Sequence, residues 1–150
     1  MDKDEVISQL NDLIETSRDG EKEFRAAAEH TEACELKAVF ENGARRCIEG
    51  ASELQSVVQR LGGSPSDGGS VSGAMRRGWT EIKEALSGMD DVAVLDELER
   101  GEDRAINAYR EALNETLPPH VLSILERQYR GVLENHQQVR DLRDRYRSAA

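Results

Sequence analysis

Three polar residues, Glu21, Glu102 and His136, lie on helical stripes that are otherwise apolar. At 1.5 Å of rise per residue, a bundle of four long helices would place all three within about 6 Å of one height. Carboxylate and imidazole groups at one level of a bundle can bind a metal ion or form a polar core network. Because an unpaired buried carboxylate is costly, we expect the three to contact one another, Gln128, Arg45 or a bound species.

The spacing of the histidines argues against the familiar di-iron centre. Di-iron bundles use a Glu from each of two helices and a Glu-x-x-His pair from each of the other two. The residues three positions before His30, His120 and His136 are Ala27, Leu117 and Leu133. Glu21, Glu102 and His136 thus remain candidate partial ligands for iron or manganese. We favour a polar core network, with no assigned catalytic or cofactor-binding residue.

Four glycines share the level of these polar residues, one on each long helix: Gly20, Gly43, Gly101 and Gly131. A glycine inside a helix costs up to about 1 kcal/mol relative to alanine, so something must offset that cost. Glycine permits close approach of two helices, leaves room for a large neighbouring side chain, or opens a small central cavity. All three explanations remain open from the sequence.

The helices follow from apolar residues at alternating three- and four-residue steps. This pattern predicts helices over 4–30, 32–61, 91–115 and from 118–119 through 143. Asp2 and Glu5 resemble a capping box at the first start, and Thr31 is expected to cap the second helix. Two prolines mark the start of the last helix, because proline is tolerated in a first turn.

Residues 62–90 form a crossover connection between the second and third long helices. Its first part, 62–73, is rich in Gly, Ser, Pro and Asp, which indicates a flexible connection. A short amphipathic helix follows, and its single tryptophan, Trp79, is expected to anchor it to the bundle. The sequence therefore predicts an all-α fold: one domain over 1–150, a ferritin-like four-helix bundle whose long crossover carries a short extra helix.

Charge and hydropathy narrow the possible partners. Thirty acidic and twenty basic residues give a formal net charge of -10, which disfavours binding to nucleic acid. No run of about 18 apolar residues suggests a membrane span, and we expect a cytoplasmic protein. Cys34 and Cys47 lie on one predicted helix, roughly 20 Å apart, so they are expected to be buried thiols without a disulfide.

Several segments resemble a bacterial ferritin-like four-helix-bundle family of unknown function. They are LNDLIETSRDG at 10–20, RGW at 77–79, ERGED at 99–103, LP at 117–118, QY at 128–129 and RDLRD at 140–144, together with His136. The resemblance covers nearly the whole chain and implies a bundle with a long crossover, but no established reaction. Arg76 and Leu98 stand where the family commonly has His and Cys, which removes two potential metal or redox ligands.

We expect a non-catalytic bundle that self-associates as a homo-oligomer and acts in protein interaction or in a stress-related structural role. The stress-related part rests on analogy alone. The alternative is a divergent iron- or manganese-binding bundle of oxidoreductase or storage type, and a third possibility is a small ligand in the glycine-lined centre. No Ser/His/Asp or Cys/His grouping can be inferred, so no enzymatic activity is predicted.

Overall fold

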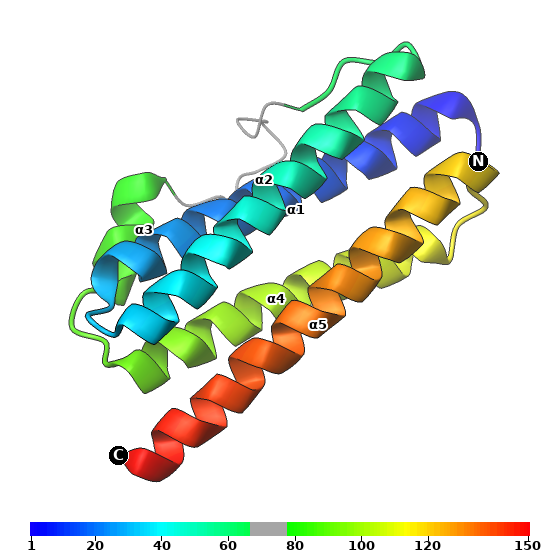
Figure 1. Ribbon diagram of the computed structural model, residues 1–150. Coiled ribbons are helices and arrows are strands. Elements are labelled where there is room, and N and C mark those ends of the chain that lie inside the picture. Colours follow the sequence, from blue (N-terminus) through cyan, green and yellow to red (C-terminus); the bar gives the residue numbers. More distant parts are fainter. Residues whose placement is uncertain (67–77) are drawn as a thin grey trace.

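The computed structural model describes residues 1–66 and 78–150. This part of the chain forms five helices: α1 (Lys3–His30), α2 (Cys34–Arg60), α3 (Trp79–Leu86), α4 (Asp91–Leu113) and α5 (Pro119–Ala149). Figure 1 shows α1 beside α2 and α4 beside α5, as two long helical hairpins with α3 at one end. The predicted all-α four-helix bundle with a short extra helix in the crossover is confirmed.

The start of α1 agrees with the sequence prediction, whereas the start of α2 differs from it. The Asp2 side chain accepts a hydrogen bond from the Glu5 backbone N–H at 2.8 Å, as expected for a cap of α1. Thr31 does not cap α2, because α2 begins only at Cys34 with Ala33 before it. The extended backbone at Thr31 instead lets its hydroxyl donate to Asp91 at 2.9 Å, which ties the α1–α2 turn to α4.

Trp79 anchors α3 to the bundle as predicted. The helix packs on α1, and the Arg25 guanidinium carbon lies 5.0 Å from the centroid of the Trp79 ring. Lys83, one turn further along α3, approaches the ring at 5.6 Å. A cation above an aromatic face is attracted by the ring quadrupole, so the tryptophan combines packing with electrostatic attraction. Most of the predicted 62–73 connection lies outside the described residues.

The buried core is divided into two apolar clusters along the bundle axis. We call the one beside α3 the α3-side cluster; its largest members are Phe24, Leu36, Phe40, Leu95 and Leu98. The other, at the end that holds the amino terminus, is the N-terminal cluster; its largest members are Leu10, Leu13, Leu54, Tyr109 and Leu125. The predicted polar level lies between them, so the four-helix scaffold carries two apolar halves and a distinct middle layer.

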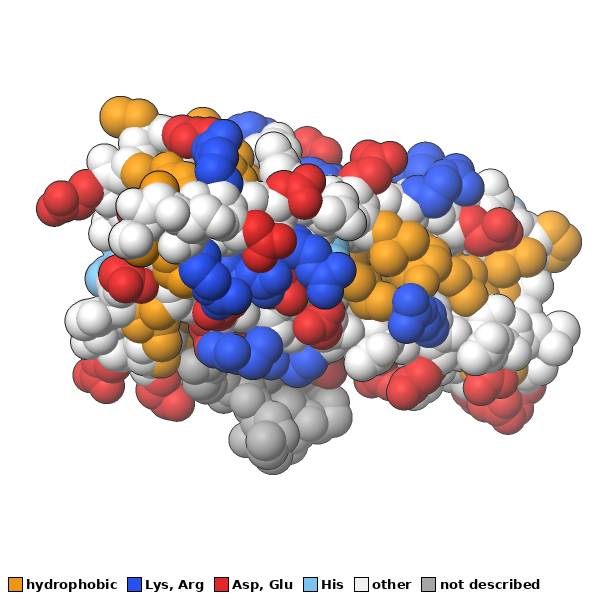
Figure 2. Space-filling model, turned by 90° about the horizontal axis from the view of Figure 1, so that it is seen from below, with side chains coloured by type: hydrophobic (Ala, Val, Ile, Leu, Met, Phe, Trp, Pro, Cys, Tyr) orange, Lys and Arg blue, Asp and Glu red, His pale blue; other side chains and the backbone are white. Residues whose placement is uncertain are grey.

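The helix pairs do not pack equally well. The α1–α2, α4–α5 and α1–α4 pairs have extensive contacts, whereas α2 and α5 approach each other at few points. Ion pairs join α5 to α4 on the outer surface, where Arg143 pairs with Glu99 at 2.5 Å and Arg147 pairs with Asp96 at 2.9 Å. Figure 2 shows one such mixed face, where Lys and Arg side chains gather among Asp and Glu side chains beside a hydrophobic band.

The two cysteines occupy different surroundings. Both lie on α2 as predicted, and both are free thiols. Cys47 is largely enclosed and packs against the α3-side cluster, whereas Cys34 is exposed. The expectation of two buried thiols is therefore wrong for Cys34, because it opens α2 at the tight α1–α2 turn rather than on the inner face. No helix within 1–66 or 78–150 is long and apolar enough to cross a membrane.

Candidate functional site

A cavity of about 430 Å³ lies between the two apolar clusters. All four long helices contribute to its wall, and each contributes at least one glycine. The glycines are Gly20 on α1, Gly43 and Gly50 on α2, Gly101 on α4 and Gly131 on α5. The glycine level predicted from the sequence is thus the wall of a cavity.

The glycines also make room for side chains from neighbouring helices. A Cβ atom at Gly20 would meet the Cys47 sulfur at 3.0 Å, and one at Gly43 would lie 2.8 Å from the Phe24 ring. Equivalent additions at Gly101 and Gly131 would collide with the side chains of Glu23 and Arg46. Two of the three explanations therefore apply together: these glycines accommodate large side chains and they border a cavity.

Glu102 of α4 and Asn135 of α5 form a buried pair in the cavity wall. The Asn135 side-chain amide donates to Glu102 Oε2 at 2.6 Å, and the two residues are only 6% and 5% exposed. Within the part of the chain that the structure describes, Glu102 Oε1 and Asn135 Oδ1 have no hydrogen-bond partner. Two buried acceptor atoms without donors are costly, so this pair is the least satisfied polar feature of the interior.

Burial raises the pKa of Glu102 to about 8. The amide of Asn135 and the charge of Arg46 act in the opposite direction, while Asp103 and Glu99 on the same helix add to the increase. At neutral pH the carboxyl group is therefore mostly protonated. In that form the carboxyl group is neutral and carries one O–H donor.

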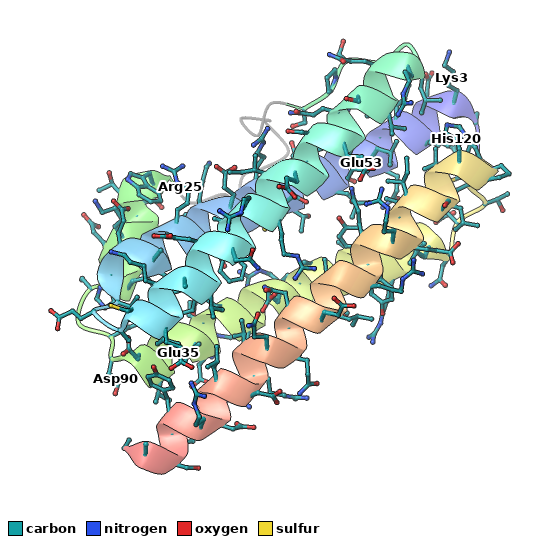
Figure 3. The ribbon with its side chains drawn as sticks, viewed as in Figure 1. Lys3, Arg25, Glu35, Glu53, Asp90 and His120 are labelled. Atoms are coloured by element: carbon teal, nitrogen blue, oxygen red, sulfur yellow. The ribbon has the colours of Figure 1, made fainter. Side chains whose placement is uncertain are left out.

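The other polar wall is a fully connected hydrogen-bond chain. The Tyr109 hydroxyl donates to Gln128 Oε1 at 2.8 Å, and the Gln128 amide donates to Glu53 Oε1 at 2.8 Å. Arg127 of α5 pairs with the same Glu53 of α2. Figure 3 shows Glu53 in the space between α2 and α5. This chain bridges α2 and α5, which approach each other at few points, and burial raises the pKa of Tyr109, which keeps its hydroxyl a donor.

The structure gives Glu21, Glu102 and His136 separate partners. Glu21 pairs with Arg18 at 3.1 Å and Arg25 at 3.6 Å on its own helix. His136 donates from Nε2 to Asp103 at 2.8 Å near the surface of the α4–α5 pair. The expected contacts among the three, or with Gln128 or Arg45, are therefore absent from the described interactions.

Glu21 and Glu102 nevertheless lie at a common level of the bundle. Burial, followed by the negative charges of Glu102 and Glu21, raises the pKa of Cys47 to about 12. Both carboxyl groups therefore lie near one thiol, and that thiol is neutral at physiological pH. A rise per residue predicts height along a helix, but the partner depends on the direction in which each side chain leaves it.

Asn135 is the residue that sequence reasoning missed. It occupies the inner stripe of α5 with Val132, Val139 and Leu142, at steps of three or four residues. The next residue, His136, was predicted to face the core in its place. A step of one residue turns the side chain by about 100° around the helix, so the two residues face different directions. The stripe spacing could have identified Asn135 as the buried polar residue of this helix.

The cavity does not fit a di-metal centre of the ferritin-like kind. Among the described residues that line it, three carry a carboxylate, Glu49, Glu53 and Glu102, and none is a histidine. Glu53 is engaged by Gln128 and Arg127, and the neutral Cys47 thiol is a poor metal ligand. The residues present therefore do not reproduce the paired Glu-x-x-His motifs that hold two metal ions in such bundles.

A separate group lies outside the cavity: Glu99, Asp103 and His136 have ligand atoms within 4.8 Å of one another. Glu99 is held by Arg143 at 2.5 Å, and Asp103 accepts from His136. Each of these groups already has a partner, and Glu99 faces arginine. The geometry is that of an ion-pair network on the α4–α5 surface.

Solved structures with a similar fold include two bacterial proteins. One is a two-domain protein from Anabaena variabilis with DJ-1/ThiJ/PfpI-like and ferritin-like domains: TM-score 0.81, 20% identity, covering 100% of this chain and 41% of that one. The other is a dodecameric thioferritin, the bacterioferritin-related protein of Bacteroides fragilis: TM-score 0.81, 21% identity, covering 99% and 90%. This chain thus spans about two fifths of the Anabaena protein. At these identities the likeness establishes the ferritin-like fold.

No curated protein matches the chain. Leu98 and Arg76 stand where the resembled family commonly has Cys and His. Leu98 is 2% exposed in the α3-side cluster, and Arg76 lies outside the described residues. Residues 5–115 match the family described as Domain of unknown function (DUF2383). That match spans most of the chain, which therefore belongs to the DUF2383 family and has a ferritin-like fold.

Proposed function

We propose that the protein is a non-catalytic binding protein, one domain over residues 1–150, whose central cavity holds a small organic ligand. The observation that carries the proposal is the pair of unpartnered acceptors, Glu102 Oε1 and Asn135 Oδ1, in the wall of a 430 Å³ cavity. Small-molecule sites occupy about 300–1,000 Å³ and combine apolar walls with a few polar groups that fix orientation. Both conditions are met here.

The composition of the wall supports an amphipathic ligand. Phe24, Ala105 and Val132 supply apolar surface, while Glu102 and Asn135 supply a polar end. Glycines in the helices and incomplete packing in the middle both lower stability. A ligand that fills the cavity and completes the hydrogen bonds would offset these costs.

The sparse contact between α2 and α5 supports an entrance on that side. Arg46, Glu49 and Glu53 of α2 and Arg127 and Gln128 of α5 all line the cavity. Glu49 and Arg127 are also exposed to solvent, so the cavity wall continues to the surface there. The Arg127–Glu53 ion pair spans this seam, and an exposed ion pair of this kind is readily exchanged for water.

Filling the cavity is expected to abolish ligand binding. In Ala105→Phe the added ring occupies the cavity, whereas Asn107→Phe places the same ring on the exposed face of α4. A fragment library screened by protein NMR should shift resonances of the cavity wall in the wild type and in Asn107→Phe, but not in Ala105→Phe. Circular dichroism checks that both variants are folded. Equal shifts in all three proteins, or stoichiometric iron or manganese in the purified wild type, would contradict the proposal.

We also propose self-association. The thioferritin from Bacteroides fragilis, similar over nearly its whole length, is described as dodecameric. Light scattering of the purified protein is expected to give a mass several times the 16.7 kDa of one chain. A single-chain mass across a wide concentration range would refute this. A cytoplasmic location is proposed as well, since both cysteines are free thiols.

The metal-dependent oxidoreductase or storage alternative is not favoured. Its candidate ligands Glu21 and His136 are bound to arginine and aspartate side chains, and the cavity lining described above lacks histidine.

A further inference from the structure

We infer that the ligand of the central cavity carries a protonated amino group, which is held between Glu102 Oε1 and Asn135 Oδ1 and displaces the proton of Glu102. The inference rests on the proposed ligand-binding function and names the chemical class of the ligand. Its basis is the hydrogen-bonding groups of the cavity wall and the apolar side chains that face them.

The two unpartnered atoms of the Glu102–Asn135 pair require hydrogen-bond donors. Once Glu102 is ionised, both open atoms of the Glu102–Asn135 pair are acceptors. An ammonium group offers three donors and no acceptor, and can therefore reach both oxygens at once. A hydroxyl group has one donor and satisfies one of them. A carboxylate has none and would add a negative charge beside Glu102.

Charges of both signs surround Glu102, and among them Arg46 has the largest effect on its pKa. On α4 it is flanked by Glu99 and Asp103, and α1 brings Glu21 and Glu23 to the same level, as their effect on Cys47 shows. Opposing these are Arg46 of α2, which lowers the pKa of Glu102, and the arginines that pair with Glu21, Glu23 and Glu99. From α5, His136 is paired with Asp103 and Arg127 with Glu53. The Cys47 thiol is neutral.

The proton balance distinguishes an amine from other ligands. Below the pKa of about 8, Glu102 enters the reaction as a neutral acid. Binding of R–NH3+ then breaks the carboxyl O–H bond and releases that proton to solvent, while no covalent bond of the ligand changes. Affinity should therefore rise about tenfold per pH unit up to about pH 8 and level off above it, until the amine itself deprotonates.

The apolar wall suggests the body of a suitable probe. Phe24 and Tyr109 present aromatic rings and Val132 an aliphatic side chain to the cavity. A phenyl ring joined to an amino group by two carbons can place the ring against this wall and the ammonium at Glu102. The probe is therefore 2-phenylethylamine, with 2-phenylethanol and phenylacetate as neutral and anionic molecules of matched size.

Isothermal titration calorimetry in two buffers of different ionisation enthalpy tests the inference. We expect 2-phenylethylamine to bind the wild type, to release about one proton per molecule at pH 7 and to gain about fiftyfold in affinity between pH 6 and pH 8. Glu102→Gln should lose the proton release and at least about tenfold in affinity at pH 8. Glu111→Gln, the same change at an exposed position of α4 that does not line the cavity, should stay within about twofold of the wild type.

The outcomes separate the ligand class from the binding function. If 2-phenylethanol or phenylacetate binds as tightly as the amine, and no proton is released, the amine assignment is wrong while the cavity remains a binding site. Amine binding that survives Glu102→Gln unchanged also overturns the assignment. If none of the three probes binds, and no fragment shifts the cavity resonances of the wild type in the NMR screen, the proposed function fails together with the inference.

Discussion

Replacing Glu102 with Gln raises the free energy of unfolding by about 3 to 5 kcal/mol at pH 9 and changes it little at pH 4. The reason is the buried carboxyl group, whose pKa is raised from 4.5 to about 8 by burial. Between these two values the folded protein binds one more proton than the unfolded chain. Wild-type stability therefore falls as pH rises through this window and becomes constant above about pH 8.

Glutamine reproduces the neutral acid in this environment. Its amide is neutral at every pH, and its carbonyl oxygen can accept from the Asn135 amide as Glu102 Oε2 does. Urea unfolding of both proteins from pH 4 to pH 9 measures the difference. Glu49→Gln, at an exposed position, should follow the wild type within about 0.5 kcal/mol throughout. Parallel profiles for wild type and Glu102→Gln would show that Glu102 is ionised in the folded state at neutral pH.

Two glycine-to-alanine changes on α2, seven residues apart, are expected to have opposite signs. Gly50→Ala adds a Cβ atom at an ordinary 3.8 Å from the Gln128 side chain, so the gain in helix propensity of about 0.5 to 1 kcal/mol should appear as stability. Gly43→Ala places a Cβ atom 2.8 Å from the Phe24 ring, which is only 4% exposed and cannot move freely. Overpacking should lower its stability by about 1 to 3 kcal/mol.

Urea unfolding of the two variants under the same conditions measures this contrast, and the identical chemical change makes each a control for the other. Combining Gly43→Ala with Phe24→Leu removes the ring that causes the clash. The double variant should therefore be more stable than the sum of the two single changes predicts. A stabilising effect of Gly43→Ala alone would mean that the Phe24 ring is free to move, and that the middle layer is looser than its contacts indicate.

Much of the fold could be predicted because it depends on local patterns. Apolar spacing gave the first three long helices to within about two residues, whereas the last runs to Ala149 rather than to 143; the Asp2 cap and the Pro119 start follow from backbone chemistry. The common level of the glycines follows from a constant rise per residue. Thr31 was misassigned because the length of the α1–α2 turn depends on its contact with Asp91, which is 60 residues away in sequence.

The details of the site depend on rotation about each helix, which the sequence constrains less well. Glu102 was identified correctly as a buried polar residue, but its partner is Asn135 rather than His136. The choice between these neighbours depends on how α5 turns against α4, and that angle is set by the packing of all four helices. The raised pKa of Glu102 follows from the same packing and has no signature in the local sequence.

The division of the core into an α3-side cluster and an N-terminal cluster has an evolutionary consequence. Each cluster has its own buried apolar residues, so a substitution in the layer between them can leave both clusters packed when it does not clash with a ring such as Phe24. The side chains of this layer can therefore change while the four helices keep their arrangement. Such modularity lets one helical architecture exchange its chemistry while its framework persists, and it accounts for a cavity with an acid–amide pair at the level where other bundles hold metal ions.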